Sequence, residues 1–118
     1  MKPARYDITV YQSATFERVF QWKDDEGNIV DLTGYNAYMQ VRRTPSQNPI
    51  LDLSTENGKI DLEEVQGKIK IYLSAEETDN LPRGEYQYDL LAQVGENGQR
   101  TRLLEGKFIV SPAVTRHE

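Results

Sequence analysis

Oxygen-bearing side chains of the kind that bind calcium gather in one short stretch. The run Asp24-Asp25-Glu26-Gly27-Asn28, with Asp31 close behind it, offers carboxylate and amide oxygens. The EF-hand spacing fails, however, because placing Gly27 at its sixth position puts Trp22 at the first ligand position. The alternative interpretation is a solvated hairpin turn. We favour the turn and assign no metal ligand.

Paired carboxylates could act as general acid and base in glycoside hydrolysis. All the candidates fall in expected turns or on a short polar helix, where no apolar surroundings would raise a carboxyl pKa. The only histidine, His117, is next to the last residue, and there is no cysteine. We therefore expect no enzyme activity, no catalytic residue and no cofactor. The carboxylates considered are Asp61, Glu63, Glu64, Glu76 and Glu77.

Three basic pairs could each form a cationic patch, since residues i and i+2 share one face of a strand. They are Arg42-Arg43, Lys68/Lys70 and Arg100/Arg102. With tyrosines between them, such patches could bind a sugar or a nucleic-acid strand. Cross-strand pairing with Asp and Glu is the interpretation we favour. For a protein interface, where Tyr and Arg are the usual anchors, the sequence predicts Tyr38, Arg42, Tyr72 and Arg102.

The length and composition of the chain limit what kind of protein it can be. The chain has 118 residues, which predicts a single domain over residues 1–118. Its net charge of −5 argues against a general affinity for nucleic acid or for anionic membrane. No apolar run approaches the roughly 20 residues of a membrane span. No apolar signal-peptide core follows residues 1–6, so we expect a protein made in the cytoplasm.

The longest period-two alternation spans residues 83–94 and predicts a central strand with one buried face. Gly95-Glu96-Asn97-Gly98 follows and predicts a hairpin into residues 99–105. Asn-Gly is the pair that most readily takes positive φ at both central positions of a type I′ turn, so we expect that turn here.

Shorter alternating runs predict the other strands. Residues 35–42 and 68–73 are the most regular, whereas Arg18 interrupts the parity of residues 15–22, which indicates either a bulge or a strand covered on both faces. Ser74 and Glu77 match a capping box that opens a helix to Leu81. Gly106 is expected to break the alternation before a last strand at 108–110. The remaining expected strands are residues 7–11, 50–54 and 60–62.

This pattern predicts an all-β fold, an antiparallel β-sandwich of Ig-like or jelly-roll-like type. It would contain about eight or nine short strands and one short helix near 74–81. Residues 1–6 and 111–118 are expected to be short terminal arms.

The order of motifs along the chain resembles a known group. It runs from Phe16…Trp22 through Asp25-Glu26-Gly27-Asn28-Ile29-Val30-Asp31-Leu32-Thr33-Gly34-Tyr35 to Gly67-Lys68-Ile69-Lys70-Ile71-Tyr72-Leu73-Ser74-Ala75-Glu76-Glu77-Thr78. Leu81-Pro82-Arg83-Gly84-Glu85-Tyr86-Gln87-Tyr88-Asp89-Leu90 follows, and then Asn97-Gly98 and Leu103-Leu104-Glu105-Gly106-Lys107-Phe108-Ile109-Val110-Ser111-Pro112. Over residues 6–116 this resembles the small β-sandwich proteins encoded in structural gene clusters of tailed bacteriophages. It is also similar to the N-terminal sandwich of phage baseplate upper proteins.

The resemblance implies a structural protein of the virion, without catalysis or cofactor. Its partners would be other virion proteins, in multiple symmetric copies, reached through sheet edges, tyrosine-rich faces and the chain ends. The location in the virion that we favour is the tail or baseplate. The second choice is the neck, or the head as a decoration protein. The baseplate upper proteins carry further domains after the sandwich, whereas this sequence ends at Glu118, which argues against direct attachment of a fibre or of a receptor-binding protein. A carbohydrate-binding sandwich that holds a host glycan on Tyr or Trp platforms is the alternative of a different class.

Overall fold

The computed structural model describes residues 3–115, and these form two packed β-sheets with one short helix. The all-β sandwich expected from the sequence is therefore confirmed. The elements in chain order are β1 (Ala4–Arg5), β2 (Ile8–Tyr11), β3 (Phe16–Gln21), β4 (Tyr35–Arg42), β5 (Leu51–Ser54), β6 (Ile60–Glu63), β7 (Lys68–Leu73), α1 (Ala75–Asp79), β8 (Gly84–Val94) and β9 (Arg100–Ser111).

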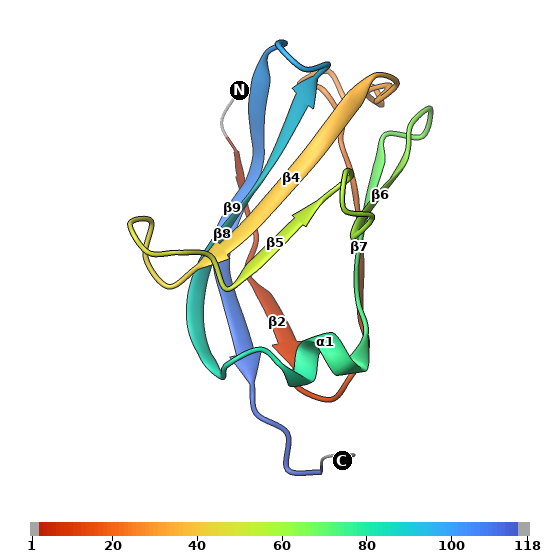
Figure 1. Cartoon of the computed structure of the whole chain (residues 1–118). Helices are drawn as coiled ribbons and strands as arrows, with labels where there is room; N and C mark the ends of the chain where they lie inside the picture. Colours follow the sequence, from red (N-terminus) through yellow and green to blue (C-terminus); the bar gives the residue numbers. More distant parts are fainter. Residues whose placement is uncertain (1–2, 116–118) are drawn as a thin grey trace.

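The larger sheet has the order β1-β9-β8-β4-β5, with β2 also paired to β9, and the smaller sheet has the order β3-β7-β6. Figure 1 shows β4, β5 and β8 running diagonally across the larger sheet, with β6 and β7 in the second layer. Strand β8 lies between β9 and β4, so the prediction of a central strand at 83–94 is confirmed. Every pairing is antiparallel except those of β1 and β2, which run parallel to β9.

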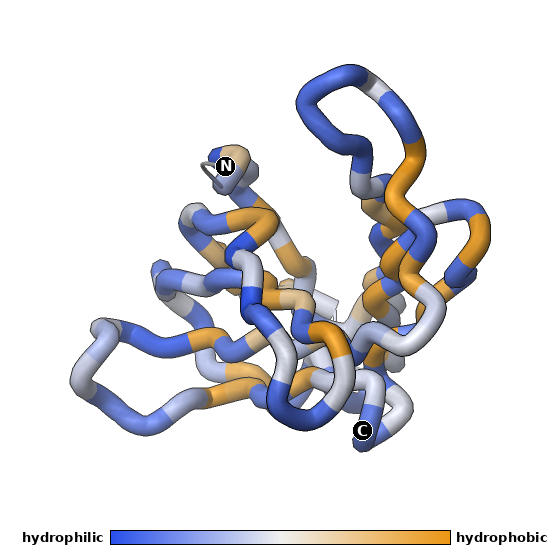
Figure 2. Tube along the Cα trace, turned by 90° about the horizontal axis from the view of Figure 1, so that it is seen from above, coloured by the Kyte–Doolittle hydropathy of each residue, from blue (hydrophilic) through white to orange (hydrophobic). Residues whose placement is uncertain are grey.

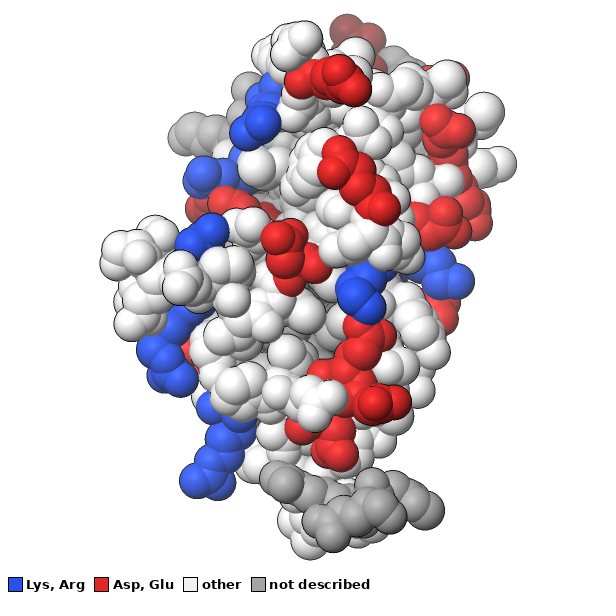
Figure 3. Space-filling model, viewed as in Figure 1, with Lys and Arg blue, Asp and Glu red and all other residues white. Residues whose placement is uncertain are grey.

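Alternation along each strand sends apolar side chains between the layers and polar ones outward. Strand β4 has the predicted bounds, with Ala37, Met39 and Val41 buried. Strand β7 also matches, with Ile69, Ile71 and Leu73 buried. Figure 2 shows the apolar positions concentrated where the two layers face each other, and Figure 3 shows the charged side chains spread over the outside.

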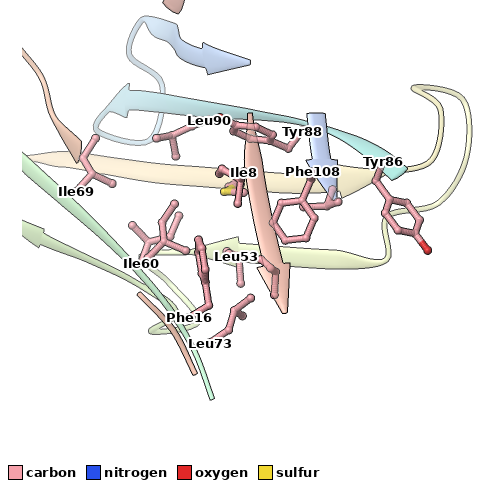
Figure 4. Packing of buried hydrophobic residues seen from close by; sticks show 14 of the residues in the cluster. Ile8, Phe16, Leu53, Ile60, Ile69, Leu73, Tyr86, Tyr88, Leu90 and Phe108 are labelled. Atoms are coloured by element: carbon pink, nitrogen blue, oxygen red, sulfur yellow. The ribbon is translucent and has the colours of Figure 1, made fainter. Parts of the chain in front are cut away.

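The core fills the space between the sheets. Ile8, Leu53, Leu90 and Phe108 are fully buried, and Figure 4 shows the larger sheet's side chains meeting those of the smaller sheet, such as Phe16 and Leu73. Burying a residue of this size contributes roughly 1.5–3 kcal/mol to folding. The pairing of Ile8 and Val10 with Phe108 and Val110 therefore makes the N-terminal strand part of the core.

Arg18 explains the mixed parity of β3. The register of β3 against β7 is continuous, so there is no bulge in this strand. The Arg18 side chain lies over the rings of Tyr6 and Phe16, 5.9 Å and 5.2 Å from their centroids, and Nη1 donates to the Tyr6 Oη at 2.9 Å. Aromatic faces and a phenol oxygen thus accommodate the cation at an inward position.

Helix α1 begins at the predicted capping box. The Ser74 side chain accepts from the Glu77 N–H, and the Glu77 carboxylate accepts from the Ser74 N–H. The helix ends at Asp79 rather than at Leu81. Thr78 Oγ1 donates to the Ala14 carbonyl at 2.9 Å, which ties the helix to the turn between β2 and β3.

The hairpin between β8 and β9 forms, but the predicted type I′ turn is wrong. Neither Asn97 nor Gly98 has a positive φ; the left-handed residue is Gly95, at φ +62°. The Val94 N–H bonds to the Gln99 carbonyl at 3.3 Å, so a longer loop closes the hairpin.

The alternation of buried and exposed residues is lost around Gly106 as expected, but the separate last strand at 108–110 is wrong, because β9 continues from Arg100 to Ser111. The register between β8 and β9 shifts at Leu90/Leu91 and not at Gly106. Gly106 is needed for close approach: a Cβ there would lie 2.4 Å from the Tyr6 carbonyl oxygen and 2.8 Å from Asp7 Oδ1.

The predicted terminal arms need correction where they are described. Ala4 and Arg5 form β1, paired with Leu104 and Glu105, and Ser111 is the last residue of β9. Residues 1–2 and 116–118, which include the only histidine, His117, lie outside the described residues.

Candidate interaction surfaces

The outer face of the larger sheet carries a hollow of about 850 Å³, here called the basic hollow. Strands β4, β8 and β9 form its floor, and the loop after β4 forms one wall through Pro45. It is lined by Arg5, Gln40, Arg42, Arg43, Pro45, Glu85, Tyr86, Gln87, Tyr88, Asp89, Leu91, Arg102, Glu105, Gly106 and Lys107.

Positive charge predominates in the basic hollow although the chain as a whole is acidic. Five cationic side chains against three carboxylates give a net +2, whereas the whole chain carries −5. Arg102 pairs with Asp89 at 3.5 Å and with Glu105 at 3.3 Å, and Lys107 pairs with Glu85 at 3.3 Å. Figure 3 shows most of the visible Lys and Arg side chains along the left of this view, and Asp and Glu mainly across its middle and right, where some Lys or Arg side chains also lie.

Arg42 and Arg43 differ from the other cations of the hollow, because neither forms an ion pair with a described carboxylate. Arg42 donates to the Gln40 amide oxygen at 2.6 Å and to the Gln47 carbonyl. The Arg43 guanidinium lies 5.0 Å from the centroid of the Tyr86 ring. Their positive charge is therefore available to a ligand or partner.

Tyr86 holds Arg43 at the rim of the hollow. Its ring is buried near the start of β8, and its Oη donates to the Pro82 carbonyl at 2.9 Å. The arrangement is similar to the tyrosine corner of Ig-like sandwiches, in which a tyrosine hydroxyl bonds to backbone a few residues upstream.

A second, smaller hollow of about 410 Å³ adjoins the first on the same face. Tyr38 lies at its edge and donates its phenol proton to Glu56 Oε1 at 3.0 Å. This hydrogen bond, with the Glu56 charge, raises the pKa of Tyr38 above its ordinary value.

The four predicted interface residues do not form one patch. Tyr38, Arg42 and Arg102 share the outer face of the larger sheet. Leu91 of β8 is the cross-strand partner of Tyr38 on one side and of Arg102 on the other. Tyr72 lies on β7, in the other sheet, with 45% of its surface exposed. Tyr38 and Tyr72 therefore lie on different sheets.

Cross-strand pairing accounts for some of the basic pairs, as the sequence analysis favoured. Lys70 lies 3.4 Å from Glu17 of the neighbouring strand, and Arg102 lies 3.5 Å from Asp89. Among the carboxylates considered for catalysis, Glu77 is paired with Lys59, whose hydrogen bond lowers the Glu77 pKa.

The stretch weighed as a calcium site forms a hairpin turn. Asp24 Oδ1 accepts from the N–H groups of Glu26 and Asn28, both at 2.9 Å, so this oxygen closes the turn. Asp31 Oδ1 accepts from the Thr33 N–H and hydroxyl, which lowers the Asp31 pKa. Within residues 3–115, no group of three or more His, Cys, Asp or Glu side chains is arranged to hold a metal ion.

Three residues that line the basic hollow were not predicted as site residues: Arg5, Arg43 and Lys107. Arg5 and Lys107 come together only through the parallel pairing of the N-terminal segment with β9. The local sequence signal for Arg43 was its place beside Arg42 before a proline-containing loop.

The smaller sheet leaves the edge of β3 unpaired. The Trp22 N–H donates to the Gly67 carbonyl at 2.8 Å, just beyond the end of β3. Antiparallel ladders alternate, so the backbone groups of Glu17, Val19 and Gln21 point away from β7. Val19 is 49% exposed.

Comparisons with known proteins support the fold assignment. The chain is similar to a solved structure described as the N-terminal domain of phage TP901-1 ORF48, with a TM-score of 0.60 and 13% sequence identity. The match covers 93% of this chain and 90% of that one. No family model and no curated protein sequence matches the chain. Among the described residues, no helix has the length and apolar character needed to cross a membrane.

Proposed function

We propose that this chain is a structural protein of a bacteriophage particle, a tail or baseplate component that acts through protein contacts and not through catalysis. The observation that carries the proposal is a similarity of fold, over 93% of this chain, to a domain of a phage protein. The order of sequence motifs supports the same origin independently, because it resembles phage structural gene products.

Several surfaces suit a protein that works by contact. The unpaired edge of β3 offers a row of backbone donors and acceptors to an added strand. The outer face of the larger sheet adds a wide polar hollow with two arginines that have no carboxylate partner in the described chain. We propose other virion proteins as the partners, in symmetric copies, and neither nucleic acid nor membrane.

The place of the protein in the particle is tested by antibody-gold labelling of purified virions, with mass spectrometry to confirm that the chain is present. We expect label at the tail end. Label at the portal end or over the shell would make the chain a neck or decoration protein. Absence from the particle would contradict the structural role.

The contribution of the β3 edge is tested with Val19→Lys, because a lysine on an edge strand disfavours addition of another strand. Incorporation into particles is expected to fall, with the thermal midpoint of the free protein unchanged. Tyr11→Lys on the exposed edge of β2 is the matched control. Binding to a host glycan stays a prediction, tested on a glycan array with Tyr38→Ala and Tyr72→Ala.

A further inference from the structure

The basic hollow presents positive charge that this chain does not neutralise. Its net charge is +2, and the guanidinium groups of Arg42 and Arg43 have no carboxylate partner among residues 3–115. Apolar surface accompanies the charge, from Leu91 on the floor and Pro45 at the wall. A fitting occupant is therefore acidic and carries some apolar side chains.

A surface of that description lies elsewhere on the same chain. Residues 23–31 and 63–66 form two neighbouring turns, here called the acidic tip. The tip is held together by the bond from the Leu32 N–H to the Glu64 carbonyl at 2.8 Å. Figure 1 shows the second of these turns projecting beyond the ends of β6 and β7. The tip contains six carboxylates and one ammonium group, from Asp24, Asp25, Glu26, Asp31, Glu63, Glu64 and Lys23.

Apolar side chains are exposed within the acidic tip. Ile29 is 47% exposed and Val65 is 75% exposed. The Ile29 side chain lies against Gly67, which follows directly after the second turn. The bonds from Glu26 and Asn28 to the Asp24 carboxylate hold the first turn in one shape before any partner binds, which reduces the entropy cost of association.

We propose that the acidic tip of one copy of this chain docks into the basic hollow of a second copy. The carboxylates of the tip would face Arg42 and Arg43, and Ile29 and Val65 would cover the apolar part of the hollow. Both partners carry −5 overall, but at physiological ionic strength charges interact mainly within about 8 Å, so local complementarity outweighs the repulsion between whole molecules.

The contact would be head-to-tail, because the two surfaces differ. Contacts of this kind close into a ring or continue as a filament, and leave one tip and one hollow free in any open assembly. The inference does not depend on the phage role, since it concerns association of the purified chain alone.

The test is sedimentation equilibrium of the full chain over a range of concentrations. We expect the mean mass of the wild type to rise with concentration at about 50 mM NaCl and the rise to weaken strongly at about 500 mM. The variants R42E/R43E and D25K/E26K are each expected to weaken association about ten-fold or more, because each places like charges opposite one another. Asp24 is left intact because it closes the turn.

The decisive experiment is to mix the two variants. Each supplies the surface that the other lacks, so an equimolar mixture is expected to associate where neither variant does alone. E17K/E76K carries the same charge change at exposed positions outside both the tip and the hollow and is expected to associate like the wild type. A wild type that stays monomeric at low salt would overturn the proposal, as would a mixture that remains monomeric while both variants are folded by circular dichroism. Binding of an acidic peptide to a monomeric wild type would assign the hollow to another protein instead.

Discussion

The phenol hydroxyl group of Tyr88, on β8, donates a hydrogen bond to the main-chain carbonyl of Tyr6, 82 residues earlier in the chain. The Tyr88 ring also packs edge-on against Phe108, with the ring centroids 6.4 Å apart. One side chain of the central strand thus joins the last strand and the N-terminal segment. The basic hollow depends on this junction, because Arg5 lines the hollow from the segment that Tyr88 holds.

Replacing Tyr88 with phenylalanine should reduce the free energy of unfolding by about 1–2 kcal/mol, because the half-buried Tyr6 carbonyl bond is lost while the ring remains. Urea unfolding monitored by fluorescence measures the change. Tyr11→Phe is the control, since Tyr11 is 61% exposed, and it should stay within about 0.5 kcal/mol of the wild type. Equal effects of the two substitutions would show that the Tyr88 hydroxyl contributes nothing specific.

Alkaline pH should destabilise the protein through the same hydroxyl. Burial, followed by the charges of Tyr6 and Asp7, raises the pKa of Tyr88 far above its ordinary value of 10.0. Above about pH 10 the unfolded chain therefore loses a proton that the folded chain keeps, so the free energy of unfolding falls as the pH rises. Each such group contributes up to about 1.4 kcal/mol per pH unit. Tyr88→Phe should show a shallower decline than the wild type between about pH 10 and pH 12. Parallel profiles for the two proteins would contradict the assignment.

Elements defined by local pattern were predictable from the sequence. Strands β4 and β7 begin and end where their alternation does, and the Ser74–Glu77 capping box marks the start of α1. In each case the signal lies within eight residues or fewer, and the burial of one face reinforces the local preference. The alternation along β4 also predicts that Tyr38 and Arg42 lie on the outer face of the sheet.

Features that depend on distant segments were not predictable in the same way. Locally Gly106 looks like a strand breaker, but it admits the Tyr6 backbone and the Asp7 side chain, about a hundred residues away, and nothing near Gly106 in the sequence indicates that contact. The parallel pairing of β1 and β2 with β9 leaves no local signature, so Arg5 and Lys107 were not expected to share a surface. The opposite placement of Tyr72 depends on which strands enter which sheet, which alternation alone does not specify.

Acid should remove the stabilisation that Glu77 provides. Its hydrogen bond with Lys59, and then that with the Ser74 N–H, lowers the Glu77 pKa below its ordinary value of 4.5. Below about pH 4.5 the unfolded chain binds a proton before the folded chain does, so the free energy of unfolding falls as the pH falls. Glu77→Gln should cost about 1 kcal/mol at neutral pH, and this cost should shrink as the pH falls below about 4.5. Glu76→Gln, at the exposed neighbouring position, is the control. A cost of Glu77→Gln that persists undiminished in acid would show that its charge has no role.

Gly106→Ala tests the close approach that brings Arg5 to the basic hollow. The added methyl group would meet the Tyr6 carbonyl and Asp7, so we expect a loss of at least about 2 kcal/mol or displacement of the N-terminal segment. Gly58→Ala separates the two possible causes, because Gly58 has φ +79° with no atom within 4 Å of the added Cβ. Its cost is purely conformational, about 1–2 kcal/mol.

Hydrogen exchange distinguishes local displacement from general destabilisation in Gly106→Ala. The Tyr6 N–H bonds to the Glu105 carbonyl at 3.0 Å, and the Lys107 N–H bonds to Asp7 Oδ1 at 2.9 Å. Both amides should lose protection in Gly106→Ala and keep it in Gly58→Ala, while amides of β7 stay protected in both. Because the same displacement would move Arg5 away from the hollow, Gly106→Ala should also weaken self-association by more than Gly58→Ala does. Unchanged protection at Tyr6 and Lys107 would mean that the strands adjust to the methyl group, and that the glycine is not required for the approach.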